Sequence, residues 1–520
     1  MSSVGLSSTL WRAHPAVRSR RRRELFVTGL AGSIALVIAL GIALEVPNPN
    51  IFLATGIVIG GLGLFALAAS ARYEVTLAIL AIYLGTIDGV IKLETANQLV
   101  SSLRDVMIAA ICVGAIVRMI VRREKVRLPP LSGWVIAFVM LVLVEAANPN
   151  TLGIAKVVGG FRQQLEWVPF FFFGYMLMRS KERFRKFFVI LGVIALANGV
   201  VSTIQTQLTP AQLSSWGPGY AERISGTGAV SGRVYVDNEG TVRVRPPALG
   251  SDLGFGGAVG VMALPGTLAL LAVGRLRRRW PAVLLCLGAL LAVATSLQRT
   301  AVLGAVFALL AFALLSFSAG RRANRALLAL LVVGALAFAF AAVLAPDAGK
   351  GVFSRYASIT PSKAASTSVQ YREGDLSQIP SDIKNYPFGA GLATAGAARS
   401  FGGHSNAKFE GHAASAESQY NYVTLELGLF GLLLWVALSV KLIVLVVRRL
   451  RNIGDIELRL SLAGVFATLI AFTIMGFAGP SMSNLPFGPY FWFAAGIASY
   501  WFGSSKSPPR LAGRAIVRSE

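Results

Sequence analysis

Long apolar segments dominate this chain and constrain its fold more than any other feature. A helix that crosses a membrane needs about 20 mainly apolar residues, and about fourteen segments meet that length. They start near residues 25, 51, 73, 103, 131, 165, 184, 253, 281, 300, 326, 419, 457 and 487. Only 14% of the residues are charged, against roughly 25% in soluble domains. The sequence therefore predicts an all-α polytopic membrane protein with about 14 transmembrane helices.

Clustered arginines and lysines predict the orientation in the membrane. The formal net charge is +25, which by itself would also suit a nucleic-acid partner. The basic residues instead lie in short groups between apolar segments, as in cytoplasmic loops, so no nucleic acid is expected. With the N-terminus inside, the groups on the cytoplasmic side are residues 12–23, Arg72, 118–127, 179–186, 275–279, 321–325, 448–451 and 506–518. Both termini are thus predicted to be cytoplasmic in a multi-pass protein.

The predicted division of the chain follows from these segments. Residues 1–24 form a basic cytoplasmic arm, residues 25–503 a single transmembrane domain, and residues 504–520 a cytoplasmic tail. The first apolar segment, residues 25–44, is long enough to span and has no small-residue cleavage site after it. It is therefore expected to be an uncleaved first helix and not a signal peptide.

Two connections on the predicted outer side are long, about 205–250 and about 345–418. Loops of that length are usually functional or disordered. In the first, residues 233–237 indicate a small hairpin, and prolines in the second indicate short helices.

Four arginines fall on the predicted outer side, where positive charge is costly and calls for a reason. They are Arg162, Arg245, Arg299 and Arg372. Arg299 stands out because almost no connection separates the apolar segments on either side of it. A guanidinium group is permanently charged and binds phosphate oxygens bidentately. We hypothesise that at least Arg299 and Arg372 clamp a pyrophosphate attached to a lipid; the alternatives are interfacial snorkelling and pairing with loop carboxylates.

Several motifs resemble those of the O-antigen ligase/polymerase superfamily of bacterial envelope enzymes. In the family's order they are residues 296–301, Arg372 with residues 387–391, and residues 417–420 leading to residues 426–431, with weaker likenesses around Arg162 and Arg245. The likeness extends over roughly residues 155–435. Each motif alone has low specificity, but their order on one consistent topology is fairly specific.

The resemblance implies a function at the outer face of the bacterial cytoplasmic (inner) membrane. Members of the family transfer glycans from an undecaprenyl-pyrophosphate carrier, without a nucleotide sugar or a metal, on a GT-C-like membrane fold. The implied partners are the carrier-linked glycan, a glycan or lipid acceptor, and membrane lipids; no cofactor is implied. The implied ligands of the pyrophosphate are Arg299 and Arg372, with Arg245 and Arg162.

The family's catalytic base is where this sequence departs from the pattern. Counting back from Gly428, the position of the usual ligase histidine holds Glu417. A carboxylate can accept the acceptor hydroxyl's proton if burial raises its pKa. His412 and His404 are alternative bases. The non-catalytic alternatives are support of a helix N-terminus for Glu417 and ordinary loop positions for the two histidines.

Glu426 follows on the same apolar segment. If both residues are helical, it faces away from Glu417, because each residue turns about 100°. We predict a buried carboxylate that either pairs with an outer arginine or serves as a polar group at a helix interface.

The missing histidine favours a repeat-unit polymerase of O-antigen or exopolysaccharide, within cell-envelope biogenesis, over a ligase that attaches finished glycan. An envelope-precursor transporter or flippase is the alternative from a different class. Transporters usually place ionisable groups near the middle of the membrane. Here the middle of each segment is almost wholly apolar, which favours surface chemistry. A non-catalytic scaffold is the third possibility.

Overall fold

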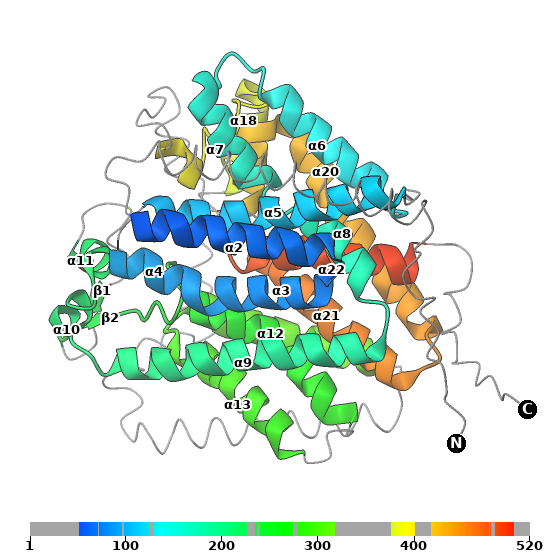
Figure 1. Cartoon of the computed structure of the whole chain (residues 1–520). Helices are drawn as coiled ribbons and strands as arrows, with labels where there is room; N and C mark the ends of the chain where they lie inside the picture. Colours follow the sequence, from blue (N-terminus) through cyan, green and yellow to red (C-terminus); the bar gives the residue numbers. More distant parts are fainter. Residues whose placement is uncertain are drawn as a thin grey trace, which may run out of the picture. The chain divides into compact units, whose positions relative to one another are not determined.

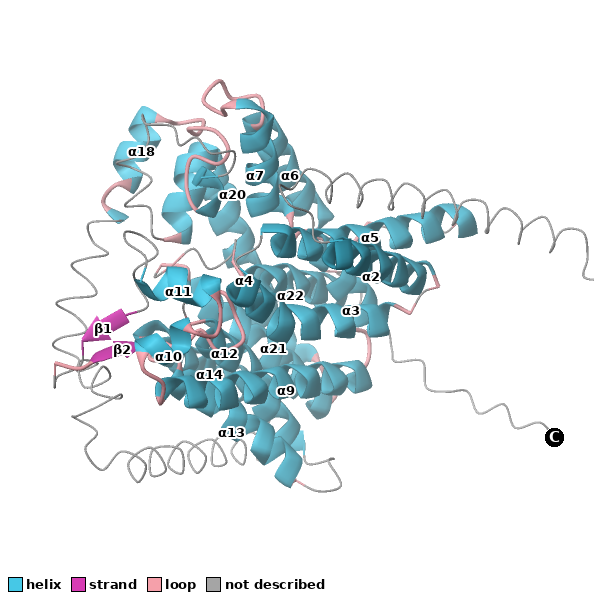
Figure 2. Cartoon of the chain, turned by 60° about the vertical axis from the view of Figure 1, so that its left-hand side comes forward, coloured by secondary structure: helices cyan, strands magenta, loops and turns pink. Residues whose placement is uncertain are grey.

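The structure is a computed structural model. It describes residues 51–70, 72–95, 98–123, 128–225, 234–236, 240–252, 254–273, 279–317, 376–400, 418–477, 479 and 484–503. These residues are predominantly helical (Figure 2). They fall into two compact units, one drawn from residues 1–80 and 97–127, the other from residues 81–96 and 128–520.

The first unit is a helix pair with part of a third helix. It contains α2 (Ile51–Ala69), α5 (Gln98–Arg122) and most of α3 (Tyr73–Ile82). Phe65, Ala110 and Val117 form the core between α2 and α5. The two backbones approach closely at Gly114, where a Cβ would lie 2.7 Å from the carbonyl oxygen of Phe65. Figure 1 shows α2 and α5 side by side.

The second unit holds the remaining elements. They are η2 (Tyr83–Ile87), α4 (Asp88–Thr95), α6 (Ser132–Glu145), α7 (Gly153–Leu165), α8 (Pro169–Leu177), α9 (Lys181–Thr206), α10 (Pro210–Ser214), α11 (Pro218–Ser225), β1 (Val234–Val236), β2 (Val242–Val244), α12 (Phe255–Val273), α13 (Trp280–Thr295), α14 (Arg299–Ser316), α18 (Ile379–Asn385), η7 (Ala397–Ser400), α20 (Gln419–Arg449), η9 (Leu450–Asn452), α21 (Ile456–Met475) and α22 (Phe487–Phe502).

Helix α12 lies at the centre of this unit and packs against α9, α13, α14 and α21. Its residues from Phe255 to Leu270 are buried, as expected for a helix that is apolar on every side. Glycines let its neighbours approach closely: a Cβ at Gly260 would lie 2.6 Å from the carbonyl oxygen of Ala289 on α13. A second packed group joins α6, α20 and α22 through the rings of Phe138, Trp435 and Trp492.

Within the described ranges, six helical segments are long and apolar enough to cross a membrane. They are Tyr73–Thr95, Lys181–Thr206, Phe255–Val273, Arg299–Ser316, Gln419–Asn452 and Ile456–Met475. Helices α6 and α13 are apolar but shorter. The prediction of an all-helical polytopic membrane fold is confirmed at this level. Fourteen spans, a GT-C-like arrangement and a single transmembrane domain from 25 to 503 stay predictions; the segments expected near residues 25 and 326 lie outside the described residues.

The two long outer connections contain regular structure. The predicted hairpin is confirmed: β1 pairs antiparallel with β2, with Val234 opposite Val244. Before it lie α10 and α11, which the sequence reading missed, and α11 packs against α4. Short helices were expected in the second connection, and its described part contains α18 and η7.

Candidate active site

The structure describes three of the seven predicted site residues. Arg162, Arg245 and Arg299 are described. Arg372, His404, His412 and Glu417 lie outside the described residues, so their roles stay predictions. The surroundings of the three described arginines, and of Ser418 directly after Glu417, show which helices build the region.

Arg299 is the first residue of α14 and follows a sharp reversal from α13. Leu297 adopts a left-handed conformation with φ of 53°, and Gln298 is extended. The Gln298 side chain packs on the backbone of Gly254, where a Cβ would lie 1.9 Å from its Oε1 atom. Arg299 is half-buried, and its buried Nε atom has no hydrogen-bond partner within the described part of the chain. A buried donor without an acceptor is costly. At this reversal the chain holds a guanidinium donor for which the described residues supply no acceptor.

Arg245 lies just after β2, in a segment that α9 holds through buried amides. Gln205 donates to the carbonyl oxygen of Ala248 over 3.1 Å and accepts from its amide over 2.8 Å. The backbone N–H of Leu249 donates to Asn198 Oδ1 over 3.1 Å. Since Asn198 and Gln205 are at most 1% exposed, the segment after Arg245 is fixed against α9.

The segments of Arg245 and Arg299 both contact the start of α12. A Cβ at Gly256 would lie 2.8 Å from the Ala248 Cβ, and Gln298 covers Gly254. The structure thus brings these two arginine-bearing segments to one helix N-terminus, which itself favours anions.

The start of α20 lies at the same end of the bundle as the start of α14. Ser418, the residue after Glu417, caps α20 by accepting from Asn421 N over 3.1 Å. Gln419 N donates to the carbonyl oxygen of Gly476, just past α21, over 2.9 Å. A Cβ at Gly304 of α14 would lie 2.2 Å from Met475 Sδ at the end of α21. Arg299 and the residue that follows Glu417 are therefore at one end of the bundle.

Arg162 lies on α7, beside a second polar group centred on Glu426 of α20. Gln163 Nε2 donates to Glu426 Oε1 over 3.0 Å, and Gln164 Nε2 donates to Oε2 over 2.6 Å. The backbone N–H of Ala395 adds a bond of 3.2 Å to Oε1. Glu426 is fully buried, so it is a polar group at a helix interface, the second of the two roles predicted for it.

Residues 387–399, here called the clamped segment, are bonded to α20 through their backbone. Ala390 N donates to Leu425 O over 2.7 Å, and Leu429 N donates to Pro387 O over 3.0 Å. Between these bonds Gly428 breaks the helix, with φ of 65° and ψ of −161°. A Cβ there would lie 2.4 Å from Pro387 O. Gly389 has φ of 104°, which agrees with the tight turn and close backbone approach that its glycines permit.

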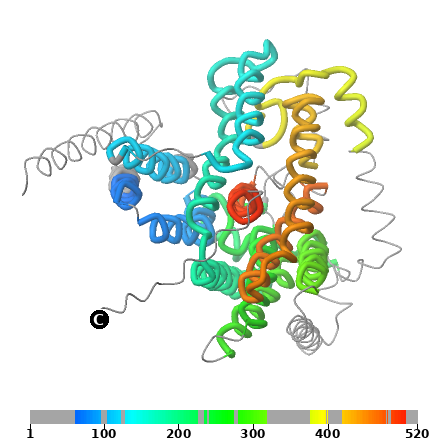
Figure 3. Tube along the Cα trace, turned by 90° about the vertical axis from the view of Figure 1, so that its right-hand side faces the viewer, coloured from blue at the N-terminus to red at the C-terminus, as the bar shows by residue number. Residues whose placement is uncertain are grey.

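The other side of the clamped segment is held by the turn between α6 and α7. Asn148 Nδ2 donates to Glu145 Oε2 over 2.9 Å and to Gly389 O over 3.1 Å. Thr151 Oγ1 accepts from Leu392 N over 2.9 Å. Figure 3 shows the yellow segment beside α6 and α7 (cyan) and the upper part of α20 (orange). The segment is thus fixed on both sides.

Sequence reasoning missed several residues of this region. Gln163 and Gln164, two adjacent amides beside an expected apolar run, were a usable signal. Lys156, also on α7, is only 4% exposed, and its ammonium group donates to the carbonyl oxygen of Arg399. Burial lowers the pKa of Lys156, and the positive charge of Arg399 lowers it further.

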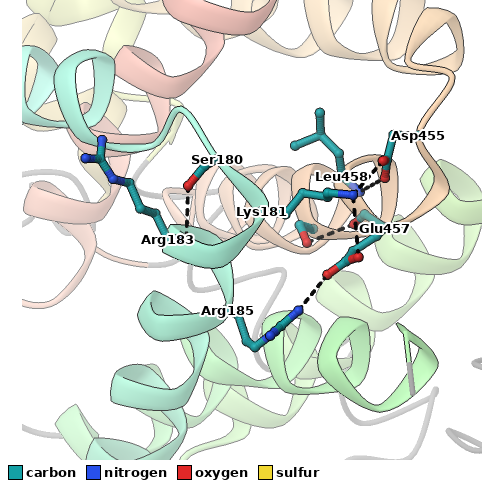
Figure 4. Close-up of polar contacts among 8 residues, drawn as sticks. Ser180, Lys181, Arg183, Arg185, Asp455, Glu457 and Leu458 are labelled. Carbon is teal, nitrogen blue, oxygen red and sulfur yellow. Dashed lines mark hydrogen bonds and ion pairs between the residues drawn. The ribbon is translucent and has the colours of Figure 1, made fainter. Parts of the chain in front are cut away.

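A separate charged group joins the N-terminal ends of α9 and α21, which lie on the predicted cytoplasmic side (Figure 4). Lys181 Nζ lies 2.7 Å from Asp455 Oδ2, and Arg185 donates to Glu457 over 3.0 Å. Lys181, Arg185 and Glu457 line a small pocket with residues of α12. Because each of these two cations has its own carboxylate, this group joins α9 to α21 and offers no spare charge to a ligand.

Comparison with known families gives a match over part of the chain. Residues 282–436 match the family model described as O-antigen ligase. Neither the curated proteins nor the solved structures gave a match. The matched range includes Arg299, the clamped segment, and Glu426 with the break at Gly428. This match makes residues 282–436 similar to the O-antigen ligase family, and the apolar helices indicate an integral membrane protein.

Proposed function

We propose that the protein transfers a glycan from an undecaprenyl-pyrophosphate carrier to an acceptor hydroxyl at the outer face of the cytoplasmic membrane. The observation that carries the proposal is the position of Arg299. Its buried Nε lacks a hydrogen-bond partner within the described ranges. The segment that carries it contacts the start of α12, as the Arg245 segment does. The match to the O-antigen ligase model, whose range includes Arg299, supports this chemistry.

In the proposed reaction the arginines stabilise the leaving group. As the acceptor hydroxyl attacks the anomeric carbon, negative charge develops on the pyrophosphate oxygens, where fixed guanidinium groups lower the barrier. Arg299 and Arg372 hold the pyrophosphate, with Arg245 and Arg162 in support, and no metal is needed to carry positive charge. The expected outcome of direct displacement is inversion at the anomeric carbon.

Glu417 takes the proton of the acceptor hydroxyl in this proposal, with His412 and His404 as the alternative bases. The adjacent Ser418 is fixed at the end of the bundle that holds Arg299, which supports this assignment. A glutamate at the position of the ligase histidine favours repeat-unit polymerisation. The proposed orientation has both termini in the cytoplasm, with the basic ends of α9 and α20 on the inner side.

The test compares Arg299→Ala and Arg299→Lys with the wild type in transfer from purified lipid-linked oligosaccharide. We expect kcat/KM to fall at least about 100-fold in both variants, since loss of one such donor costs about 3 kcal/mol of transition-state stabilisation. Arg451→Ala, an exposed arginine beyond the far end of α20, is the matched control and should behave as the wild type. Normal turnover by Arg299→Ala refutes the proposed clamp.

The glycans that accumulate in cells lacking the protein distinguish a polymerase from a ligase. Accumulation of carrier-linked single units without polymer indicates a polymerase, whereas carrier-linked polymer that is never attached indicates a ligase. Reconstituted protein that moves the precursor across a bilayer without forming product is a flippase. Silent substitutions of Arg299 and Glu417 indicate a scaffold.

A further inference from the structure

Two cations, Lys156 and Arg399, lie together where α7 meets the end of the clamped segment. Lys156 on α7 is 4% exposed and donates to the carbonyl oxygen of Arg399 in η7. Arg399 is half-buried. Within the described residues, neither side chain forms an ion pair with an Asp or a Glu. This contrasts with Lys181 and Arg185 at the other end of the bundle, each of which has its acid.

Without a ligand, holding these two cations together destabilises the folded protein. A buried ammonium group loses its hydration, and no carboxylate in the described part of the chain neutralises it. The second positive charge makes this worse, which agrees with the lowered pKa of Lys156. Costly charges of this kind concentrate at functional sites, because a ligand supplies the missing countercharge.

The carbonyl contact alone does not account for a lysine at this position. An ammonium group has three donors, and Arg399 O takes one of them. A neutral amide side chain would satisfy that carbonyl oxygen without burying a charge. An oxyanion would accept from the remaining donors of Lys156 and from the guanidinium of Arg399, whose partial exposure leaves it accessible.

The helices around the pair differ from those around Arg299. Helix α7 packs on η7 and α6, whereas α14 packs on α12, α13 and α21. The pair is therefore built on other helices than Arg299, although Arg162, which supports the pyrophosphate in the proposed function, also lies on α7. Its element η7 ends at Ser400.

We propose that Lys156 and Arg399 form a binding subsite for an acidic group, a carboxylate or a phosphate, on the glycan that the protein transfers. The inference rests on the proposed transferase function and adds a substrate class to it. An acidic sugar unit held here has its negative charge shared between α7 and η7. Neutral glycans gain nothing from the pair.

The test measures binding to the purified full-length protein in detergent, without any transfer step. The probes are a lipid-free oligosaccharide with one uronic acid, the same oligosaccharide with a neutral hexose in its place, and geranyl pyrophosphate. The variants are Lys156→Gln, which keeps a donor for Arg399 O, and Arg399→Gln. Lys384→Gln removes an exposed lysine of α18 and is the control.

We expect both variants to bind the uronate oligosaccharide at least tenfold more weakly, while the control binds as the wild type does. Affinities for the neutral oligosaccharide and for geranyl pyrophosphate should not change, and the thermal unfolding midpoints should match. Wild-type protein that does not prefer the acidic over the neutral probe overturns the inference, as does selective loss of geranyl pyrophosphate binding. Because no product is measured, a failure of the transferase proposal appears in the turnover assay and a failure of the acidic subsite appears here.

Discussion

Gln164 on α7 donates a hydrogen bond of 2.6 Å to Glu426 on α20, a residue 262 positions further along the chain. Gln163 donates to the other carboxylate oxygen over 3.0 Å. A buried carboxylate is thus surrounded by neutral donors, with the Ala395 N–H among them. Because the donors come from α7 and from the clamped segment, Glu426 fixes the positions of both relative to α20.

Glu426→Gln should loosen this junction. Gln163 and Gln164 donate to different carboxylate oxygens, and glutamine replaces one of these oxygens with an NH₂ group. That NH₂ would face the NH₂ of either Gln163 or Gln164, so at least one buried donor loses its acceptor. We expect the free energy of unfolding to fall by about 3 kcal/mol, with faster proteolysis within residues 387–399. Chemical denaturation in detergent and limited proteolysis measure the two effects.

The control for this prediction exchanges the hydrogen-bond donor and acceptor of one contact. Adding Gln164→Glu to Glu426→Gln places a carboxylate opposite an amide again, so part of the lost stability should return. If the stability losses of the two substitutions simply add, the two side chains are not directly coupled.

Gly428→Ala should prevent the clamped segment from docking on α20. The backbone at Gly428, with φ of 65° and ψ of −161°, is a conformation essentially restricted to glycine. The added Cβ would also lie 2.4 Å from Pro387 O and 2.5 Å from Gly389 N, both backbone atoms. We expect a loss of at least about 2 kcal/mol in stability together with loss of transfer activity.

Gly454→Ala is the matched control, because a Cβ at Gly454 meets no atom within 4 Å. Thermal unfolding of both purified variants makes the comparison. Equal midpoints would show that the close approach of residues 387–389 to Gly428 is not maintained in the membrane protein.

Asp455 gives a stability effect that depends on pH. Partial burial acts to raise its pKa, but the hydrogen bond from Lys181, the backbone N–H of Leu458 and the lysine's charge outweigh burial and lower the pKa overall. Its contribution is therefore present above the unfolded-state pKa of about 3.9, and is lost as pH falls through the lower folded-state pKa. At pH 7 we expect Asp455→Asn to lose up to about 1 kcal/mol, since the pair is partly exposed.

Comparing Asp455→Ala with Asp455→Asn distinguishes the stabilising effect of the charge from that of the helix cap. Asp455 also accepts from Leu458 N over 3.0 Å as the N-cap of α21, a role that asparagine retains. Alanine should cost about 1 kcal/mol more than asparagine. Denaturation series at pH 7 and below the folded-state pKa of Asp455 test this. The stability loss of Asp455→Asn relative to the wild type should disappear at the acidic pH. A loss that stays constant with pH contradicts a contribution from the ion pair.

The membrane fold was readable from the sequence because the length and apolarity of a span are local properties. The hairpin was readable for the same reason, from the alternating residues at Val234–Val236. Helix α10 also had a local signal, the capping box between Thr209 and Gln212 with Pro210 after the cap, which the sequence reading did not use.

The contacts that build the site were not readable in this way. The bonds from Asn198 to Leu249 and from Gln164 to Glu426 join residues far apart in the chain. No periodicity or turn signal marks such pairs. The left-handed Leu297 is likewise imposed by packing, since leucine has no intrinsic preference for that conformation. Arg299 was found because its charge is anomalous where it stands, whereas Lys156 looked like an ordinary helix residue.

The attachment of the clamped segment on both sides has a consequence for how this protein can diversify. Surface connections normally accept insertions and deletions. Its first part cannot, because adding a residue between Pro387 and Leu392 would shift its hydrogen bonds to Leu425, Leu429 and Thr151 out of register. Homologues that handle other sugars should therefore keep the length of this stretch and differ instead in the side chains it carries or in the length of sequence beyond Ser400.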